Sequence, residues 1–185
     1  MLAYKGVSKD FTGHGGYKFK MGLNTTTEAK CGRNGFHAAE NPFDCLSHFN
    51  RIHSDIFCLV NAGGDIHEHG CDSRISCTEL TFLKKLTIEQ FFLLGLGYMM
   101  EHPLRKCSNV SNNMAIAYGD YAIVRGLCPK AKGSKGAYLA LAKESEDSQE
   151  IVAVKLIRVD GKTYRCDTWY TIGDDGEIEI ARNEK

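Results

Sequence analysis

The chain has no net charge, no long hydrophobic run and no familiar catalytic signature. Its 185 residues carry 23 Lys and Arg against 23 Asp and Glu, so no long-range field attracts it to nucleic acid or to an anionic membrane. The most apolar stretch, Phe91 to Met100, is about half of the ~20 residues needed to span a bilayer. We therefore expect no membrane association, and any contact with a polyanion must come from a local patch.

The sequence motifs characteristic of common enzyme classes are also absent. The sequence contains no Walker loop, no dinucleotide fingerprint, no nucleophile elbow and no His-Glu-x-x-His pair. The opening residues, MLAYKGVSKDF, have no apolar signal region. We therefore expect a soluble, cytoplasmic protein that uses no cofactor.

Cysteine, in contrast, is plentiful. Most of the eight cysteines lie inside apolar periodic segments, where a reduced thiol behaves as a small hydrophobic side chain. Cys45 and His48 fall on one helical turn, but a thiol nucleophile needs an exposed and electropositive setting. We predict reduced thiols and do not propose a thiol enzyme.

Short apolar segments between Gly and Asp-Gly or Asn-Pro steps predict about nine strands. Asp160-Gly161 is typical of a two-residue hairpin turn. Gly63 and Gly64 are expected to end the strand predicted at residues 56–62. The clearest strands are predicted at residues 2–6, 17–21, 36–39, 56–62, 75–82, 138–142, 151–159, 168–172 and 178–180, with short strands joined by tight turns between 107 and 136.

Two helices are expected. Asn41 can cap the first, with Pro42 at its first position, where a missing N–H costs nothing. Thr87 and Gln90 form a capping box for the second, which Pro103 ends.

This element order predicts an α+β fold, a largely antiparallel sheet with two helices packed on it. The length suits one domain over residues 1–185. A weak subdivision into 1–102 and 113–185 is the alternative, because the intervening stretch is the clearest linker.

His67, His69, Cys71 and Cys77 are residue types that zinc prefers. Their spacing departs from the usual paired intervals of structural zinc sites, C-x2-C or H-x3-H. A polar surface loop is the simpler interpretation, so no metal is predicted and these four remain the only metal candidates.

Arg125, Lys130, Lys132 and Lys135 form the one compact basic run, set among glycines in a turn-rich segment. Such a loop can hold phosphates through its cations and its exposed backbone N–H groups. The alternative is a solvated loop, since four charges are few for nucleic acid.

His37 lies between Phe36 and Ala38 on an expected buried strand. Its imidazole can hydrogen-bond either a substrate or a neighbouring backbone group. The sequence leaves both interpretations open.

The segments YKGVSKDFTGHGGYKF, GFHAAENPFDCLSHF, GSKGAYLALAK, VDGKTY and DTWY together resemble an uncharacterised domain family of tailed bacteriophages and prophages. The resemblance implies an accessory protein in the cytoplasm of a bacterial host cell. Such a protein would bind a host protein or ribonucleoprotein complex, most concretely to inhibit a defence system such as a CRISPR effector.

A more remote likeness is to ADP-ribosyltransferase-like domains. Tyr4-Lys5-Gly6, Gly35-Phe36-His37 and the Asn41-capped helix follow the order of that family. The likeness implies NAD as cofactor, with Tyr4 and Lys5 at the nicotinamide end, His37 in the cleft, and Asp167 or Glu150 orienting the ribose.

Two departures weaken the transferase alternative. Lys5 stands where the family has His or Arg, and no Glu stands alone at the start of a late strand. Because no convincing trio of acid, base and electrophile is present, we favour a binding role over catalysis.

Overall fold

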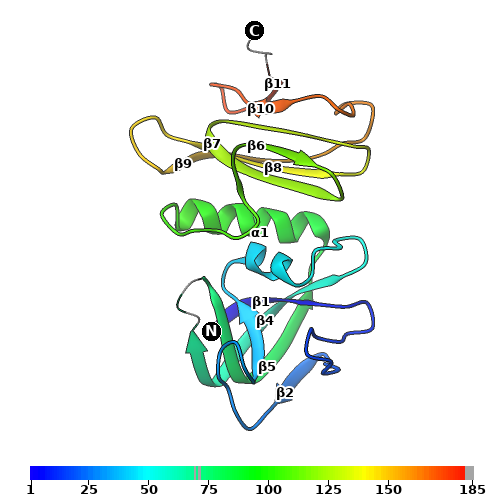
Figure 1. Ribbon diagram of the computed structural model, residues 1–185, viewed down its shortest axis with the longest axis vertical. Coiled ribbons are helices and arrows are strands. Elements are labelled where there is room, and N and C mark those ends of the chain that lie inside the picture. The colour runs from blue at the N-terminus through cyan, green and yellow to red at the C-terminus, as the bar shows by residue number, and fades with distance from the viewer. Residues whose placement is uncertain (69, 71, 182–185) are drawn as a thin grey trace. The chain divides into compact units, whose positions relative to one another are not determined.

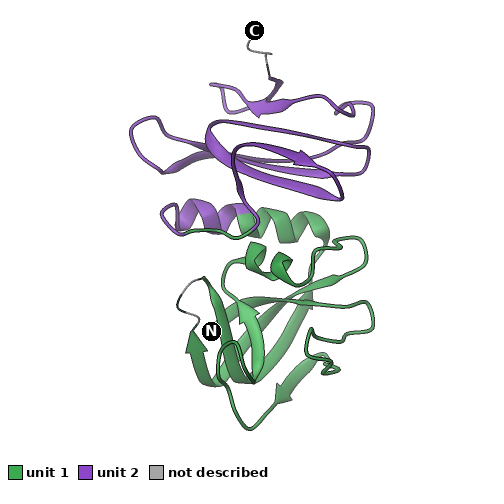
Figure 2. Cartoon of the chain, in the orientation of Figure 1, with its two compact units in different colours: residues 1–95, 106–108 green, residues 96–105, 109–185 purple. Residues whose placement is uncertain are grey.

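The computed structural model describes residues 1–68, 70 and 72–181. Contacts within the chain group it into two compact units (Figure 2). Unit 1 comprises residues 1–95 and 106–108, and unit 2 comprises residues 96–105 and those from 109 onwards. Within the described ranges, no helix is long and apolar enough to cross a membrane.

Unit 1 is built from one antiparallel sheet that closes on itself (Figure 1). The strand order is β2-β5-β3-β1-β4, and β4 pairs back onto β5, so that four of the strands form a ring. Its strands are β1 (Leu2–Val7), β2 (Gly22–Thr25), β3 (Phe36–Ala39), β4 (Ile56–Glu68) and β5 (Arg74–Lys85).

The ring encloses an apolar core. Because successive strand residues face opposite sides, one face of each strand supplies the interior. Its buried members include Ala3, Val7, Phe36, Ala38, Cys58, Val60, Ile75, Cys77, Leu80 and Phe82. Phe19, from the segment between β1 and β2, joins this cluster. The predicted strand at 17–21 is replaced by β2, which begins at Gly22.

The prediction that Gly63 and Gly64 end a strand is wrong. β4 continues through both to Glu68, and its register with β5 shifts between Gly63 and Ile66. Gly64 has a φ of 65°, which a glycine adopts without a Cβ clash. Gly63 still pairs with Glu79, and the shift lies at Gly64 and Asp65, where a β-bulge bends the strand instead of stopping it.

Both predicted helix starts are present, but only one helix is long. Asn41 accepts a hydrogen bond from the Phe43 N–H at 3.0 Å and caps η1 (Pro42–Ser47), a 3-10 helix of 6 residues. Thr87 and Gln90 exchange the two 3.1 Å hydrogen bonds of a capping box at the start of α1 (Ile88–Glu101), which has 14 residues.

The predicted α+β class is therefore wrong, and the chain is β-rich. A capping signal fixes where a helix begins but not how far it continues, and η1 ends after 6 residues. The sheet hydrogen bonds are mostly antiparallel, in barrel-like sheets.

Unit 2 holds a second sheet, ordered β11-β10-β7-β8-β9, with β6 also paired to β7. β6 and β7 are parallel, as are β7 and β8. The second half of β7 and the following turn carry the chain back so that Tyr138 pairs with Tyr121. Its strands are β6 (Ser111–Ala117), β7 (Tyr121–Gly133), β8 (Tyr138–Glu144), β9 (Ile151–Arg158), β10 (Tyr170–Ile172) and β11 (Ile178–Ile180).

The predicted two-residue hairpin at Asp160-Gly161 is also wrong. The Asp160 carboxylate accepts hydrogen bonds from the Lys162 and Tyr164 N–H groups, at 2.7 and 3.0 Å. These bonds build a wider loop, because an Asp side chain can replace a strand partner for nearby N–H groups. The next strand, β10, pairs with β7 and β11 and not with β9.

Candidate functional site

Unit 1 contains a cavity of about 600 Å³ between β1, β3, η1 and two glycine-bearing loops. We call it the Lys5 cavity. Pockets that hold small ligands usually measure roughly 300–1,000 Å³. Its chemically active lining residues are Lys5, His14, Cys31, Arg33, His37, Asp44, Cys45, His48 and Arg74, and its aromatic lining residues are Tyr17, Phe19, Phe36 and Phe49.

Lys5 supplies a buried amine to this cavity. The side chain is only 8% exposed, and its Nζ donates a 2.6 Å hydrogen bond to the backbone carbonyl of His37. Nζ also lies 5.1 Å from the centre of the Phe19 ring. Burial lowers the pKa of Lys5 to about 8, because an apolar setting penalises the charged form.

Two of the cavity histidines are held neutral by their surroundings. The His37 Nε2 accepts the Gly32 N–H at 3.1 Å, and burial, followed by the charges of Lys5 and Arg74, lowers its pKa. Burial, His14 and Arg74 lower the pKa of His48 in the same way. Burial is the main cause of both shifts, and the neighbouring positive charges add to it.

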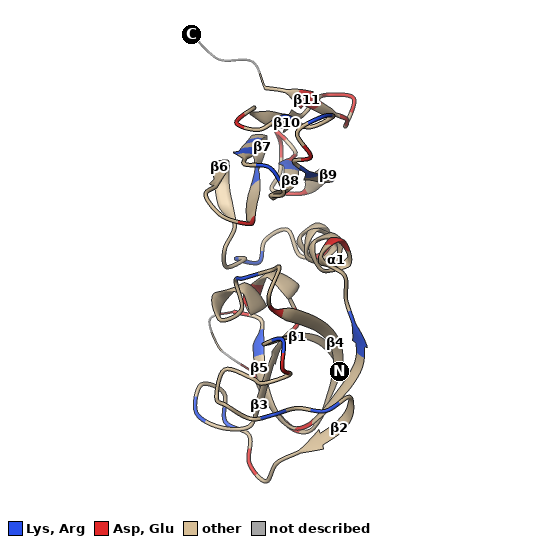
Figure 3. Ribbon diagram, turned by 90° about the vertical axis from the view of Figure 1, so that its right-hand side faces the viewer, with Lys and Arg blue, Asp and Glu red and all other residues tan. Residues whose placement is uncertain are grey.

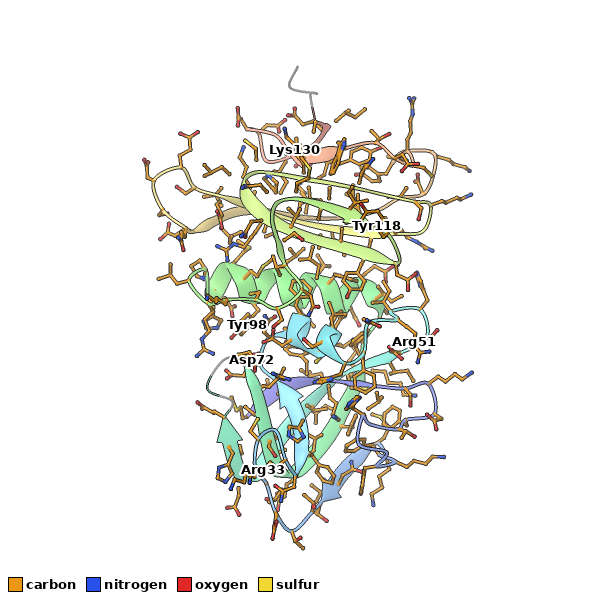
Figure 4. All side chains as sticks on the ribbon, viewed as in Figure 1. Arg33, Arg51, Asp72, Tyr98, Tyr118 and Lys130 are labelled. Carbon is orange, nitrogen blue, oxygen red and sulfur yellow. The ribbon has the colours of Figure 1, made fainter. Side chains whose placement is uncertain are left out.

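The cavity also receives two guanidinium groups. Arg74, at the start of β5, is paired with Asp72 at 2.7 Å and lies 3.2 Å from the Nε2 of His48. Arg33 comes from the loop before β3 and is exposed. Figure 4 labels Arg33 and Asp72 on these two segments of unit 1.

Asp44 is the one carboxylate among the lining residues. It is 1% exposed, and one of its oxygens accepts both the Ser73 N–H and the Ser73 hydroxyl, at 3.2 and 2.7 Å. The other oxygen accepts the Ser108 N–H at 3.2 Å. These bonds tie η1 to two other segments. Arg74 has Asp72 as its acidic partner, whereas Lys5 and Arg33 form no ion pair within the described ranges.

The thiols in and near the cavity are not activated. Burial raises the pKa of Cys45 to about 12 and those of Cys58 and Cys77 to about 11. A protonated thiol is a poor nucleophile. The seven described cysteines are all free thiols.

The residues predicted for a transferase are only partly brought together. Lys5 and His37 line the same cavity, whereas Tyr4 lies on the other face of β1 and is not among the lining residues. Asp167 belongs to unit 2, in an exposed loop where its φ is 51°. Glu150 is also an exposed residue of unit 2.

The predicted basic loop lies mostly in a strand. Arg125, Lys130 and Lys132 belong to β7, and Lys135 follows it. Arg125 forms a 2.5 Å ion pair with Glu144, and the Nζ of Lys132 lies 5.2 Å from the centre of the Trp169 ring. Figure 3 shows acidic and basic segments interspersed through unit 2. Phosphate binding by this segment stays a prediction.

The predicted zinc candidates are only partly visible. His67 is exposed on β4, and Cys77 is fully buried in β5. His69 and Cys71 lie outside the described residues. Across the described ranges, no three His, Cys, Asp or Glu side chains gather in an arrangement that could hold a metal ion.

Sequence reasoning missed much of the cavity. It did not single out His14, Arg33, Asp44 or Arg74, and it considered His48 only as a partner for Cys45. The usable signal was the pair of glycine-bearing loops, GHGG at 13–16 and CGRNG at 31–35. Each of these loops carries an exposed side chain, His14 in the first and Arg33 in the second.

The comparisons with known proteins agree with this division of the chain. No curated protein and no solved structure gives a significant match. A family model described as a domain of unknown function (DUF7666) matches residues 1–94, which include every residue lining the Lys5 cavity. The chain therefore belongs to the DUF7666 family, a domain of unknown function.

Proposed function

We propose that unit 1 binds a small anionic ligand in the Lys5 cavity. The observation that carries the proposal is the excess of cations over available acids among the lining residues. Three cations, Lys5, Arg33 and Arg74, line the cavity, and of these only Arg74 has an ion-pair partner among the described residues, Asp72. The one lining carboxylate, Asp44, accepts hydrogen bonds from Ser73 and Ser108 instead. A buried cation is costly unless it is paired, and a bound anion would supply the missing partner.

The rim of the cavity suits recognition of a carboxylate or a phosphate. Arg33 is exposed, and no ion pair of its side chain is found within residues 1–68, 70 and 72–181. A guanidinium presents two parallel N–H donors to such a group. The exposed rings of His14 and His48, with centroids 4.8 Å apart, lie beside the same opening.

Thermal unfolding of the full chain with inorganic phosphate, glyoxylate or NAD tests this proposal. We expect at least one of these anions to stabilise the protein, because a ligand that binds only the folded state shifts the equilibrium toward it. Arg33→Met and Arg74→Met should each weaken binding about tenfold, the effect of losing a charge-assisted hydrogen bond of about 1.5 kcal/mol.

Arg51→Met is the matched control, because Arg51 is an exposed arginine outside the cavity that pairs with Asp55. It should leave anion binding unchanged. Equal weakening in all three variants, or no stabilisation by any anion, would contradict the proposal. Stabilisation by NAD alone would instead favour the NAD-dependent transferase alternative, in which Lys5 and His37 contact the cofactor.

We also propose that unit 2 contacts a macromolecular partner, as the phage-family resemblance implies. Among the strands that the structure describes, β6 pairs with β7 alone, which leaves its other edge without a described strand partner. Met114 on this strand is 55% exposed, and Tyr118 just after it is 91% exposed. Exposed apolar side chains beside a free strand edge are typical of binding surfaces.

Co-purification from a bacterial host lysate tests this second proposal. The wild-type chain should retain a host protein or ribonucleoprotein complex that Met114→Lys with Tyr118→Ser loses. Val152→Lys is the control, because Val152 is 56% exposed on β9, a different edge of the same sheet. Equal retention by both variants would remove β6 from the interface.

A further inference from the structure

The Lys5 amine occupies a position that ordinary lysines avoid. Ala3 and Val7 lie on the same face of β1 and are both 0% exposed in the apolar core. Lys5 lies between them, paired in register with the fully buried Cys58. The four-carbon stem is therefore buried in the ring interior, and the amine is presented to the cavity.

The contacts of this amine satisfy a neutral form as well as a charged one. Its hydrogen bond goes to a backbone carbonyl, that of His37, which can accept from either NH2 or NH3⁺. In the part of the chain that the structure describes, no carboxylate forms an ion pair with Nζ. The thiols with the largest electrostatic effect on Lys5 are those of Cys45 and Cys77. Both stay protonated at neutral pH, because burial raises their pKa.

We infer that Lys5 is a nucleophile that forms an imine with an anionic carbonyl compound, such as an α-oxo acid, bound in the Lys5 cavity. This inference rests on the proposed function, because the cations at the rim would hold the carboxylate. Arg33 and Arg74 supply that recognition, and the buried amine faces the carbonyl carbon from inside the same cavity.

The protonation state of Lys5 is compatible with this role. Burial lowers its pKa to about 8, so that about a tenth of the amine is neutral at pH 7, against less than roughly a thousandth for an ordinary lysine. A lysine desolvated in an apolar pocket is an established form of activated amine.

The reaction needs no oxidant or reductant. The Nζ lone pair attacks the carbonyl carbon, a C–N bond forms, and the carbonyl electron pair moves to oxygen. Proton transfer from nitrogen to oxygen gives a neutral carbinolamine. A proton from solvent, equivalent to the one that the ammonium released to become the free amine, then protonates the hydroxyl, the C–O bond breaks and one water leaves, giving the protonated imine. The positive imine replaces the ammonium charge next to the His37 carbonyl.

Reductive trapping tests the inference on the full chain. The protein is incubated at pH 7 with glyoxylate and cyanoborohydride, which reduces an imine to a stable secondary amine, and the labelled lysines are mapped by peptide mass analysis. We expect Lys5 to be labelled at least about tenfold faster than Lys9, because a larger fraction of it is neutral. Lys9 is the internal reference because it is exposed and close in sequence.

A neutral aldehyde, propanal, separates the two proposals. If both hold, Arg74→Met slows labelling of Lys5 by glyoxylate and leaves labelling by propanal unchanged, and Lys5→Met removes the fast label. If Lys5 is labelled no faster than Lys9 by either aldehyde, the imine inference is overturned, while stabilisation by phosphate still measures anion binding. Fast labelling by propanal with no advantage for glyoxylate supports the nucleophile and overturns anion recognition.

Discussion

At the residue scale, Lys5 is the clearest case of a side chain whose position opposes stability. Its pKa is about 8 in the folded chain, against the ordinary value of 10.5. Between these two pH values the unfolded chain binds more protons, so the stability of the folded chain rises with pH. The cost of burying the charge is fully present below about pH 8 and is gone above pH 10.5.

We therefore predict that Lys5→Met is more stable than wild type at pH 7 and that this advantage shrinks as the pH rises toward 10. The difference should change by about 2–3 kcal/mol between pH 7 and 10, since each pKa unit corresponds to about 1.4 kcal/mol. Urea unfolding at a series of pH values measures it. Lys9→Met should show no such trend, and a difference that stays constant from pH 7 to 10 would show that Lys5 is not buried as a strained charge.

His37 illustrates how the structure resolves an alternative that the sequence left open. Its ring accepts a hydrogen bond from the Gly32 N–H, which is the alternative of a bond to a neighbouring backbone group. The same side chain also lines the cavity beside Lys5. The side chain therefore orders the loop at 31–35 and forms part of the cavity wall. A single histidine in a strand pattern could not distinguish these roles, because both require the same half-buried position.

At the scale of elements, α1 contains two glycines that differ in whether a larger side chain would fit. A Cβ added at Gly95 would collide with ring atoms of Phe43, whereas one added at Gly97 would meet nothing within 4 Å. Phe43 comes from η1 and also contacts Phe91 and Phe92 of α1, with ring centroids 6.2 and 5.9 Å apart. Gly95 is thus needed for the close approach of η1 to this helix.

We predict that Gly95→Ala destabilises the protein by about 1–3 kcal/mol, the usual cost of overpacking. Gly97→Ala should stabilise it by roughly 0.5–1 kcal/mol, because alanine loses less backbone entropy than glycine in a helix. Thermal and urea unfolding of both variants give the comparison. Equal effects of the two substitutions would mean that the ring of Phe43 does not pack against Gly95.

The elements also show which local signals were sufficient. The Asn41-Pro42 and Thr87-Gln90 patterns place helix starts correctly, because a cap satisfies N–H groups within its own turn. Gly63-Gly64 misled the prediction, because a glycine with positive φ is equally suited to a turn and to a bulge. The choice between these depends on whether another strand is present to pair beyond the glycines.

At the scale of the whole molecule, the chain comprises two units, each built around its own sheet. The family match covers residues 1–94, which are nearly all of unit 1 and include the Lys5 cavity. The two proposed activities fall on different units: ligand binding in unit 1 and partner contact at β6 in unit 2. Substitutions at Met114 and Tyr118 should therefore leave the anion-dependent stabilisation of unit 1 unchanged.

The sequence by itself determined the approximate positions of most strands and both helix caps, but not the number of strands, which in the described part of the chain is eleven and not about nine. These properties depend on interactions between residues a few positions apart in the sequence. Apolar periodicity and turn residues reflect such local interactions directly. The sequence also identified His37 from its position on an expected buried strand, and Lys5 only through a family resemblance.

Only the tertiary structure decided that β4 pairs with both β1 and β5 to close the ring. That closure buries Lys5 beside the His37 carbonyl, 32 residues away, and brings Arg74 to the same cavity. Strand pairing over such separations depends on which hydrogen bonds and apolar faces are completed together, and no local pattern encodes it. The chemistry proposed for this protein therefore arises from the closed sheet and not from any single motif.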